Sequence, residues 1–119
     1  MKQSLFARVL LLITLGHLVV GGLLFAPSLA ELPARGWVNS IGPNFLEGSV
    51  AIWFMLFAWP LLLIVVQFWR NEEPVNSTFL LVCMLGSVFG ISLMPASGFW
   101  LMLLLSGYAF AKQHLRLQQ

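Results

Sequence analysis

Long apolar runs, broken by short polar stretches, dominate the hydrophobic pattern of this chain. They cover about residues 5–26, 48–69, 77–94 and 98–111. A helix that crosses the hydrocarbon core of a membrane needs roughly 20 apolar residues, and about four such helices with their connections use nearly the whole chain. The pattern therefore predicts an all-α membrane protein, with residues 1–119 forming a single four-transmembrane-helix bundle.

Prolines and polar residues predict where these helices end or bend. Residues 27–45 contain several prolines and glycines and predict a long loop with local turns. Pro60 lies in the middle of the second span and predicts a kink, because it removes one helical hydrogen bond. Asn76 or Ser77 is placed to cap the third span, and Pro95 ends it. The last two helices are therefore predicted to form an antiparallel hairpin.

Composition and charge favour the same interpretation. The chain is 60% hydrophobic and 8% charged over 119 residues, which is too apolar for a water-soluble domain of this size. The positive-inside rule predicts that both ends of the chain lie in the cytoplasm and that the loop of residues 27–45 faces outward. This orientation rests on the basic residues of one side, with only Arg35 on the other: Lys2, Arg8, Arg70, Lys112 and Arg116.

The first apolar run has a second interpretation. A basic start followed by an apolar stretch and by Ser28-Leu29-Ala30 resembles a cleavable secretory signal. The run is long for a signal core and contains the polar residues Thr14 and His17. We therefore expect this segment to be the first transmembrane span.

His17 is the ionisable side chain that lies deepest in an apolar run. Thr14 and Gly21 lie one turn away on either side and share its helix face. The simplest interpretation is a neutral histidine that hydrogen-bonds between helices as part of the packing. Contact with a ligand is the second interpretation, and metal binding or catalysis is the third.

The predicted topology brings other polar and aromatic residues to the outward end. There we expect a cavity that opens to the outer leaflet, with His17 as its polar floor and Trp53 and Phe54 in its walls. Asn44 and Glu47 also have the spacing of a helix cap, and Trp100 suits an ordinary interfacial position. The predicted ligand-binding residues are His17, Thr14, Asn44, Glu47, Trp53, Met94, Ser97 and Trp100.

Several other kinds of site are not predicted. The one cysteine, Cys83, lies within an apolar run, and no cluster of histidine and cysteine has metal-ligand spacing, so we predict no metal site. No nucleophile, base and orienting acid can be assembled from the spacing, so catalytic residues and cofactors stay unknown. The charges form no basic stripe, and nucleic acid is not expected as a partner. Gly86 and Gly90 favour close helix packing, within the bundle or between protomers.

Four short strings carry a resemblance to a known family. They are Gly16-His17, Gly21-Gly22, Ala51-Ile52-Trp53-Phe54, and the most specific one, Met94-Pro95-Ala96-Ser97-Gly98-Phe99-Trp100. With them the chain resembles, over nearly its whole length, an uncharacterised bacterial family of small four-helix integral membrane proteins, a domain of unknown function. The resemblance implies a multi-pass protein of the inner (cytoplasmic) membrane and implies no activity.

Three functions follow as hypotheses. The first is the binding of a lipid, quinone or other hydrophobic small molecule in the outward-facing cavity. The second is a membrane enzyme that acts on a lipid-like substrate with His17 and Glu47 as acid and base, which requires those side chains to meet. The third is an accessory subunit of a larger membrane complex. A second copy of the chain and a membrane partner protein both stay open as partners, besides the lipid bilayer itself.

Overall fold

The computed structural model describes residues 1–38 and 40–116, and its named elements are all helices. They are α1 (Gln3–Leu24), α2 (Ala26–Glu31), α3 (Leu46–Leu56), α4 (Ala58–Phe68), α5 (Ser77–Leu93) and α6 (Phe99–Arg116). The prediction of an all-α chain is confirmed for these residues, and the helices lie close to the four apolar runs. The main difference is at α6, which continues about one turn beyond the predicted end of its run because its charged last turn is also helical.

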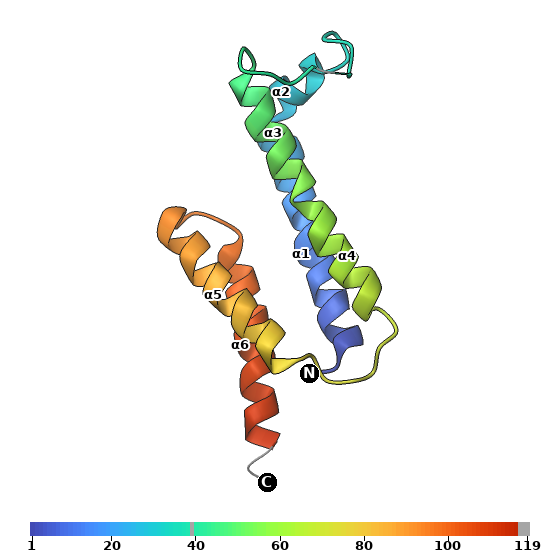
Figure 1. Cartoon of the computed structure of the whole chain (residues 1–119), viewed down its shortest axis with the longest axis vertical. Coiled ribbons are helices and arrows are strands. Elements are labelled where there is room, and N and C mark those ends of the chain that lie inside the picture. Colours follow the sequence, from blue (N-terminus) through green and yellow to red (C-terminus); the bar gives the residue numbers. More distant parts are fainter. Residues whose placement is uncertain (39, 117–119) are drawn as a thin grey trace.

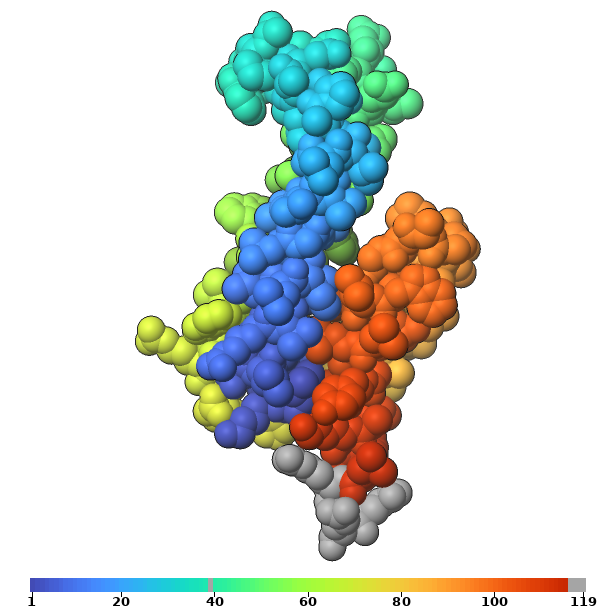
Figure 2. Space-filling view, turned by 180° about the vertical axis from the view of Figure 1, so that it is seen from behind, coloured from blue at the N-terminus to red at the C-terminus, as the bar shows by residue number. Residues whose placement is uncertain are grey.

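The helices form two antiparallel hairpins that lie side by side (Figure 1). In the first hairpin α1 packs against α3 and α4, and in the second α5 packs against α6. Both ends of the described chain lie at the same end of the molecule, which we call the terminal end. The opposite end of the first hairpin, which carries α2 and the loop of residues 32–45, is the distal end. Figure 2 shows that α6 accompanies only the terminal part of α1, so the distal part of the first hairpin stands free.

Among the described residues, two helices are long and apolar enough to cross a membrane. One is α1, and the other is the continuous segment Leu46–Phe68 that comprises α3 and α4. At 1.5 Å per residue α1 is about 33 Å long, close to the roughly 30 Å of a hydrocarbon core. Helix α5 is equally apolar but shorter. Large apolar side chains point outward from these helices, such as Leu23 and Val66, which are 75% and 74% exposed.

The hydrophobic core occupies the terminal half of the molecule, where all four long segments meet. Phe6, Leu10 and Leu80 are fully buried there. The ring of Phe6 packs edge-on against Phe68 of α4 and Phe79 of α5, with centroids 6.1 and 5.9 Å away. Edge-to-face packing of this kind adds stabilisation beyond the burial of area. The two hairpins are therefore held together at their terminal halves.

Hydrogen bonds at the terminal end fix the linker between the two hairpins. The amide N–H of Gln3 donates to the carbonyl of Glu73 over 2.8 Å, and the N–H of Val75 donates to the carbonyl of Met1 over 3.1 Å. The side-chain amide of Gln113 in α6 donates to the carbonyl of Val75. Val75 itself is 1% exposed. The linker is thus bonded to the start of α1 on one side and to the end of α6 on the other.

The helix is interrupted near Pro60, and we call this break in the regular helix the kink. Helices α3 and α4 are separated at Phe57, three residues before the proline. The N–H of Phe57 is shared between the carbonyls of Trp53 at 3.1 Å and Phe54 at 3.3 Å, a tightening of the helix that is common at helix ends. Because proline lacks an N–H and its ring crowds the preceding turn, regular bonding is lost at this point.

The two predicted helix caps have different outcomes. The side-chain oxygen of Asn76 accepts from the N–H groups of Thr78 at 2.8 Å and Phe79 at 3.3 Å, so Asn76 caps α5 as predicted. Helix α3 begins after Phe45, with no side-chain cap bond. The interpretation of Asn44 as a cap is therefore wrong, because the helix starts one residue later than that cap requires.

Candidate functional site

His17 makes a hydrogen bond that joins α1 to the kink of the neighbouring helix. Its Nε2 lies 2.7 Å from the carbonyl oxygen of Phe54, the same carbonyl that receives the long bond from Phe57. A carbonyl oxygen only accepts, so Nε2 of His17 carries the proton of this bond. Near a proline kink, helical carbonyls have lost part of their regular bonding and need another donor inside a membrane. His17 supplies that donor.

Aromatic rings surround His17 on the side of α3. The imidazole stacks on the ring of Phe54, with centroids 4.1 Å apart and planes at 12°, and it lies 5.9 Å from the ring of Phe57. Phe54 also contacts Phe25 at 5.3 Å, and Phe57 contacts Phe99 of α6 at 6.3 Å. The ring cluster therefore links α1, the α3–α4 kink and the second hairpin in one layer of the molecule.

A glycine lets α1 approach α3 closely next to this cluster. A Cβ atom placed on Gly21 would lie 2.7 Å from both Sδ of Met55 and a ring carbon of Phe54. Thr14, one turn before His17, is fully buried and donates from its hydroxyl to the carbonyl of Leu10 at 2.8 Å. Thr14 is thus satisfied within its own helix and has no bond to His17.

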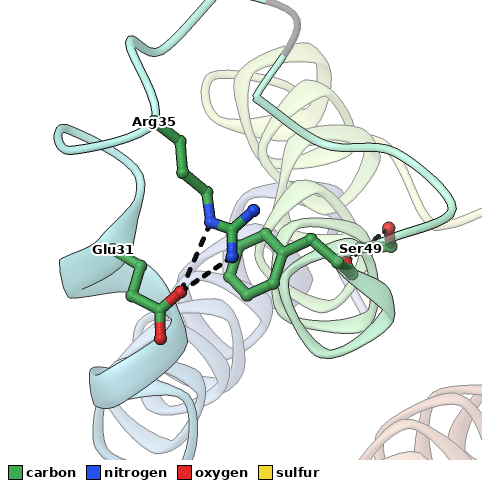
Figure 3. A network of polar contacts seen from close by, with 4 residues as sticks. Glu31, Arg35 and Ser49 are labelled. Carbon is green, nitrogen blue, oxygen red and sulfur yellow. Dashed lines mark hydrogen bonds and ion pairs between the residues drawn. The ribbon is translucent and has the colours of Figure 1, made fainter.

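The loop at the distal end is pinned by a charged contact (Figure 3). The guanidinium of Arg35 pairs with the carboxylate of Glu31 at 3.2 Å and lies over the ring of Phe45, 3.9 Å from its centroid. Gly36 follows with φ of 85°, a left-handed conformation that suits glycine and turns the chain back. The ring of Phe45 also covers Gly48, where a Cβ atom would clash. These contacts hold the loop against the start of α3.

A groove lies beneath this loop, between α1–α2 and α3, and we call it the distal groove. Its volume is about 400 Å³. Glu47 and Ser28 are its polar lining residues, and the other lining residues are apolar. The lining residues are Leu24, Phe25, Pro27, Ser28, Leu46, Glu47 and Val50. Concave apolar surfaces with few polar groups are typical of small-molecule sites.

A second groove of about 370 Å³ lies along the middle of the first hairpin. Trp59 is its largest lining side chain, and no charged residue borders it. The lining residues are Leu18, Ile52, Met55, Leu56, Ala58, Trp59 and Leu62. This groove offers apolar contact alone, so it lacks a group that could orient a ligand.

The structure does not bring the eight predicted ligand-binding residues together. Glu47 lines the distal groove, and Asn44 lies exposed just before α3. Trp53 is 73% exposed, and Phe54 rather than Trp53 occupies the position next to His17. Three more of the predicted residues lie at the turn between α5 and α6, away from α3: Met94, Ser97 and Trp100.

The three residues of that turn belong mainly to the second hairpin. The indole N–H of Trp100 donates to the carbonyl of Pro95 at 2.9 Å, which closes the turn. Met94 ends α5 and is 57% exposed. The hydroxyl oxygen of Ser97 is enclosed and has no hydrogen-bond partner among the described residues. Because Phe99 reaches Phe57, this turn lies level with the kink rather than with Glu47.

The acid–base pair required by the enzyme hypothesis is not formed. Glu47 precedes Phe54, the partner of His17, by seven residues, which corresponds to about 10 Å along the helix axis. Side chains on a helix lean toward its N-terminus, so Glu47 points further from His17. Direct hydrogen bonding between the two side chains is therefore excluded in this arrangement.

Most residues of the distal groove were missed in the sequence. The groove residues are three or four positions apart within each segment. In the first segment Leu24 is followed by Pro27 and Ser28, and in the second Leu46 and Glu47 are followed by Val50. Such spacings place residues on one helix face, which was the available signal. It was hidden because Pro27 was predicted to begin a loop, whereas it lies in the first turn of the short helix α2.

Each end of the molecule carries one ion pair. At the distal end Arg35 is paired with Glu31, and Glu47 belongs to neither ion pair found among the described residues. At the terminal end the ammonium of Lys2 lies 2.8 Å from the carboxylate of Glu72. Hydrogen bonds from Lys2 and Ser4 lower the pKa of the Glu72 carboxyl.

No group of three potential metal ligands lies together within residues 1–38 and 40–116.

Comparison with known proteins identifies the family of this chain but no activity. No curated protein matches this sequence, and no solved structure matches this fold. A family model does match, and it covers residues 1–116, which is almost the whole chain. The chain therefore belongs to DUF6463, a family of unknown function.

Proposed function

We propose that this chain is a four-span bacterial inner-membrane protein that binds a hydrophobic or amphiphilic small molecule in the distal groove. Both ends of the chain lie in the cytoplasm, and the distal end faces outward. The single observation that carries the binding proposal is the groove itself: a mainly apolar concavity of about 400 Å³ with Glu47 and Ser28 as its polar lining residues.

The placement of the helices supports four spans. Besides the two helices that are long enough to cross a membrane, α5 and α6 are about 25 and 27 Å long and lie antiparallel beside them. Both ends of the described chain and the linker between the hairpins lie at the terminal end (Figure 1). Lys2, Arg70 and Lys112 lie there too, and this agrees with a cytoplasmic face under the positive-inside rule.

The position of the groove supports a ligand from the membrane. Its lining joins the ends of two apolar helices, and its polar border lies next to the loop that we place at the outer surface. A molecule from the outer leaflet therefore reaches the groove without crossing the bilayer. The exposed apolar side chains around it, such as Leu24 and Val50, continue the groove into the lipid-facing surface.

The test uses a photoreactive long-chain alcohol and the full chain in phosphatidylcholine nanodiscs. Val50 is 52% exposed and lines the groove, so Val50→Trp fills it. Val66→Trp is the matched control, since Val66 is 74% exposed on α4 outside the groove. Crosslinked peptides are mapped by mass spectrometry.

We expect crosslinks concentrated at residues 24–28 and 46–50. Val50→Trp should reduce them severalfold, and Val66→Trp should leave them unchanged. Circular dichroism of both variants reports whether the helices are retained. Crosslinks spread evenly along all lipid-facing helices, with no effect of Val50→Trp, would overturn the proposal and leave the groove as ordinary lipid-covered surface.

A further inference from the structure

We infer that the distal groove selects a single-chain amphiphile with an ammonium head group, which Glu47 binds while the tail runs along α3 toward the kink. This inference rests on the proposed function, because it names the chemistry of the ligand for the same groove. Two observations carry it: the unpaired charge of Glu47 and the direction of the apolar track below it.

The carboxylate of Glu47 is available to a cation. The only cationic side chain near the distal groove among the described residues is Arg35, and it is held between Glu31 and the ring of Phe45. Glu47 lies in the first turn of α3, at the end of the groove nearest the loop. A negative group without a counter-ion, at the polar border of an apolar groove, complements an ammonium and repels an anion.

An apolar track leads from Glu47 along one face of α3. Leu46 and Val50 are one turn apart, and Phe57 follows Val50 by seven residues, close to two full turns. These three side chains therefore lie in line. Ten residues separate Glu47 from Phe57, so the track is about 15 Å long.

The second hairpin approaches α3 at the far end of the track. Phe57 meets Phe99 at 6.3 Å, and Phe99 is itself seated on Gly90, where a Cβ atom would lie 2.5 Å from its ring. The volume of about 400 Å³ is near the lower limit of small-molecule sites, roughly 300–1,000 Å³. It suits one alkyl chain rather than a two-chain phospholipid.

The experiment compares three photoreactive probes with the same alkyl chain, bearing an ammonium, an alcohol or a sulfonate. The full chain is used in phosphatidylcholine nanodiscs at neutral pH, and groove crosslinks at residues 24–28 and 46–50 are counted. Glu47→Gln removes the charge at nearly constant volume. Glu73→Gln is the matched control, because Glu73 is an exposed glutamate at the terminal end.

We expect the ammonium probe to label the groove about two- to fivefold more than the alcohol, the range of an exposed ion pair, and the sulfonate to label it least. Glu47→Gln should abolish this preference without reducing labelling by the alcohol, and Glu73→Gln should preserve it. Equal labelling by all three probes would overturn the inference and leave the binding proposal intact. Labelling by none of them, insensitive to Val50→Trp, would remove the binding proposal as well.

Discussion

Replacement of His17 by phenylalanine tests the bond between α1 and the kink. Phenylalanine keeps an aromatic ring of similar size that can stack on Phe54, but it cannot donate to the Phe54 carbonyl. We expect His17→Phe to lower the free energy of unfolding. His17→Gln is the complementary variant, since glutamine keeps an N–H donor and loses the ring.

The size of the effect follows from how well the carbonyl is satisfied. Hydrogen bonds between transmembrane helices contribute about 0.6 kcal/mol on average and up to about 2 kcal/mol. The Phe54 carbonyl retains a bond from Phe57, although at 3.3 Å, so it is not left wholly without a partner. We therefore expect a loss of about 1 kcal/mol for His17→Phe, and a smaller loss for His17→Gln if the amide reaches the same oxygen.

The assay is reversible unfolding in mixed micelles of a mild detergent and sodium dodecyl sulfate, followed by circular dichroism. Leu12→Phe is the control, because Leu12 is 69% exposed on the same helix and adding a ring there changes no described contact. Unfolding curves of His17→Phe that coincide with those of Leu12→Phe and the unaltered chain would refute the assigned role of the bond.

Three further predictions follow from the contacts described above. Gly21→Ala should destabilise the first hairpin by about 1–3 kcal/mol in the same assay, because the new methyl group overlaps packed side chains, whereas Gly22→Ala should be neutral or slightly stabilising since nothing lies within 4 Å of its Cβ position. On a cysteine-free background, Ser40→Cys should react with a membrane-impermeant maleimide in intact cells and Asn71→Cys only after the cells are broken; the reverse pattern would invert the proposed orientation. Because the pKa of Glu72 is lowered in the folded chain, its contribution to stability is complete above its ordinary pKa of 4.5 and is lost as the pH falls through the folded value. Glu72→Gln should therefore reduce the loss of stability between pH 6 and about pH 3, and an unchanged pH profile would contradict the contribution of its ion pair.

The helices were predictable from sequence because their signals are local. Apolar runs of the right length, Pro60 within one of them and Asn76 before another each act on their own turn of helix. In the structure the helices lie close to the apolar runs, the regular helix is interrupted at Phe57, and Asn76 caps α5. His17 was also identified in advance, since an ionisable residue in an apolar run needs a partner.

The contacts between helices could not be predicted in the same way. Nothing in the spacing states that the partner of His17 is the backbone of Phe54, because a carbonyl is present at every residue and only the kink makes this one available. The convergence of Met94, Ser97 and Trp100 with Glu47 was expected from topology alone. Topology gives the end of the bundle that a residue occupies, but α5 and α6 are shorter than the first hairpin, so their turn stops at the level of the kink.

The bonded linker at the terminal end also sets an order for assembly. The carbonyl of Val75 is held by Gln113, 38 residues later in the chain, while the N–H of Val75 is held by Met1 at the start of the described chain. During synthesis the first hairpin and the linker leave the ribosome before the residue that completes this connection. The final closure of the two hairpins therefore follows the formation of the first hairpin, and a chain cut short before Gln113 would have its linker bonded on one side only.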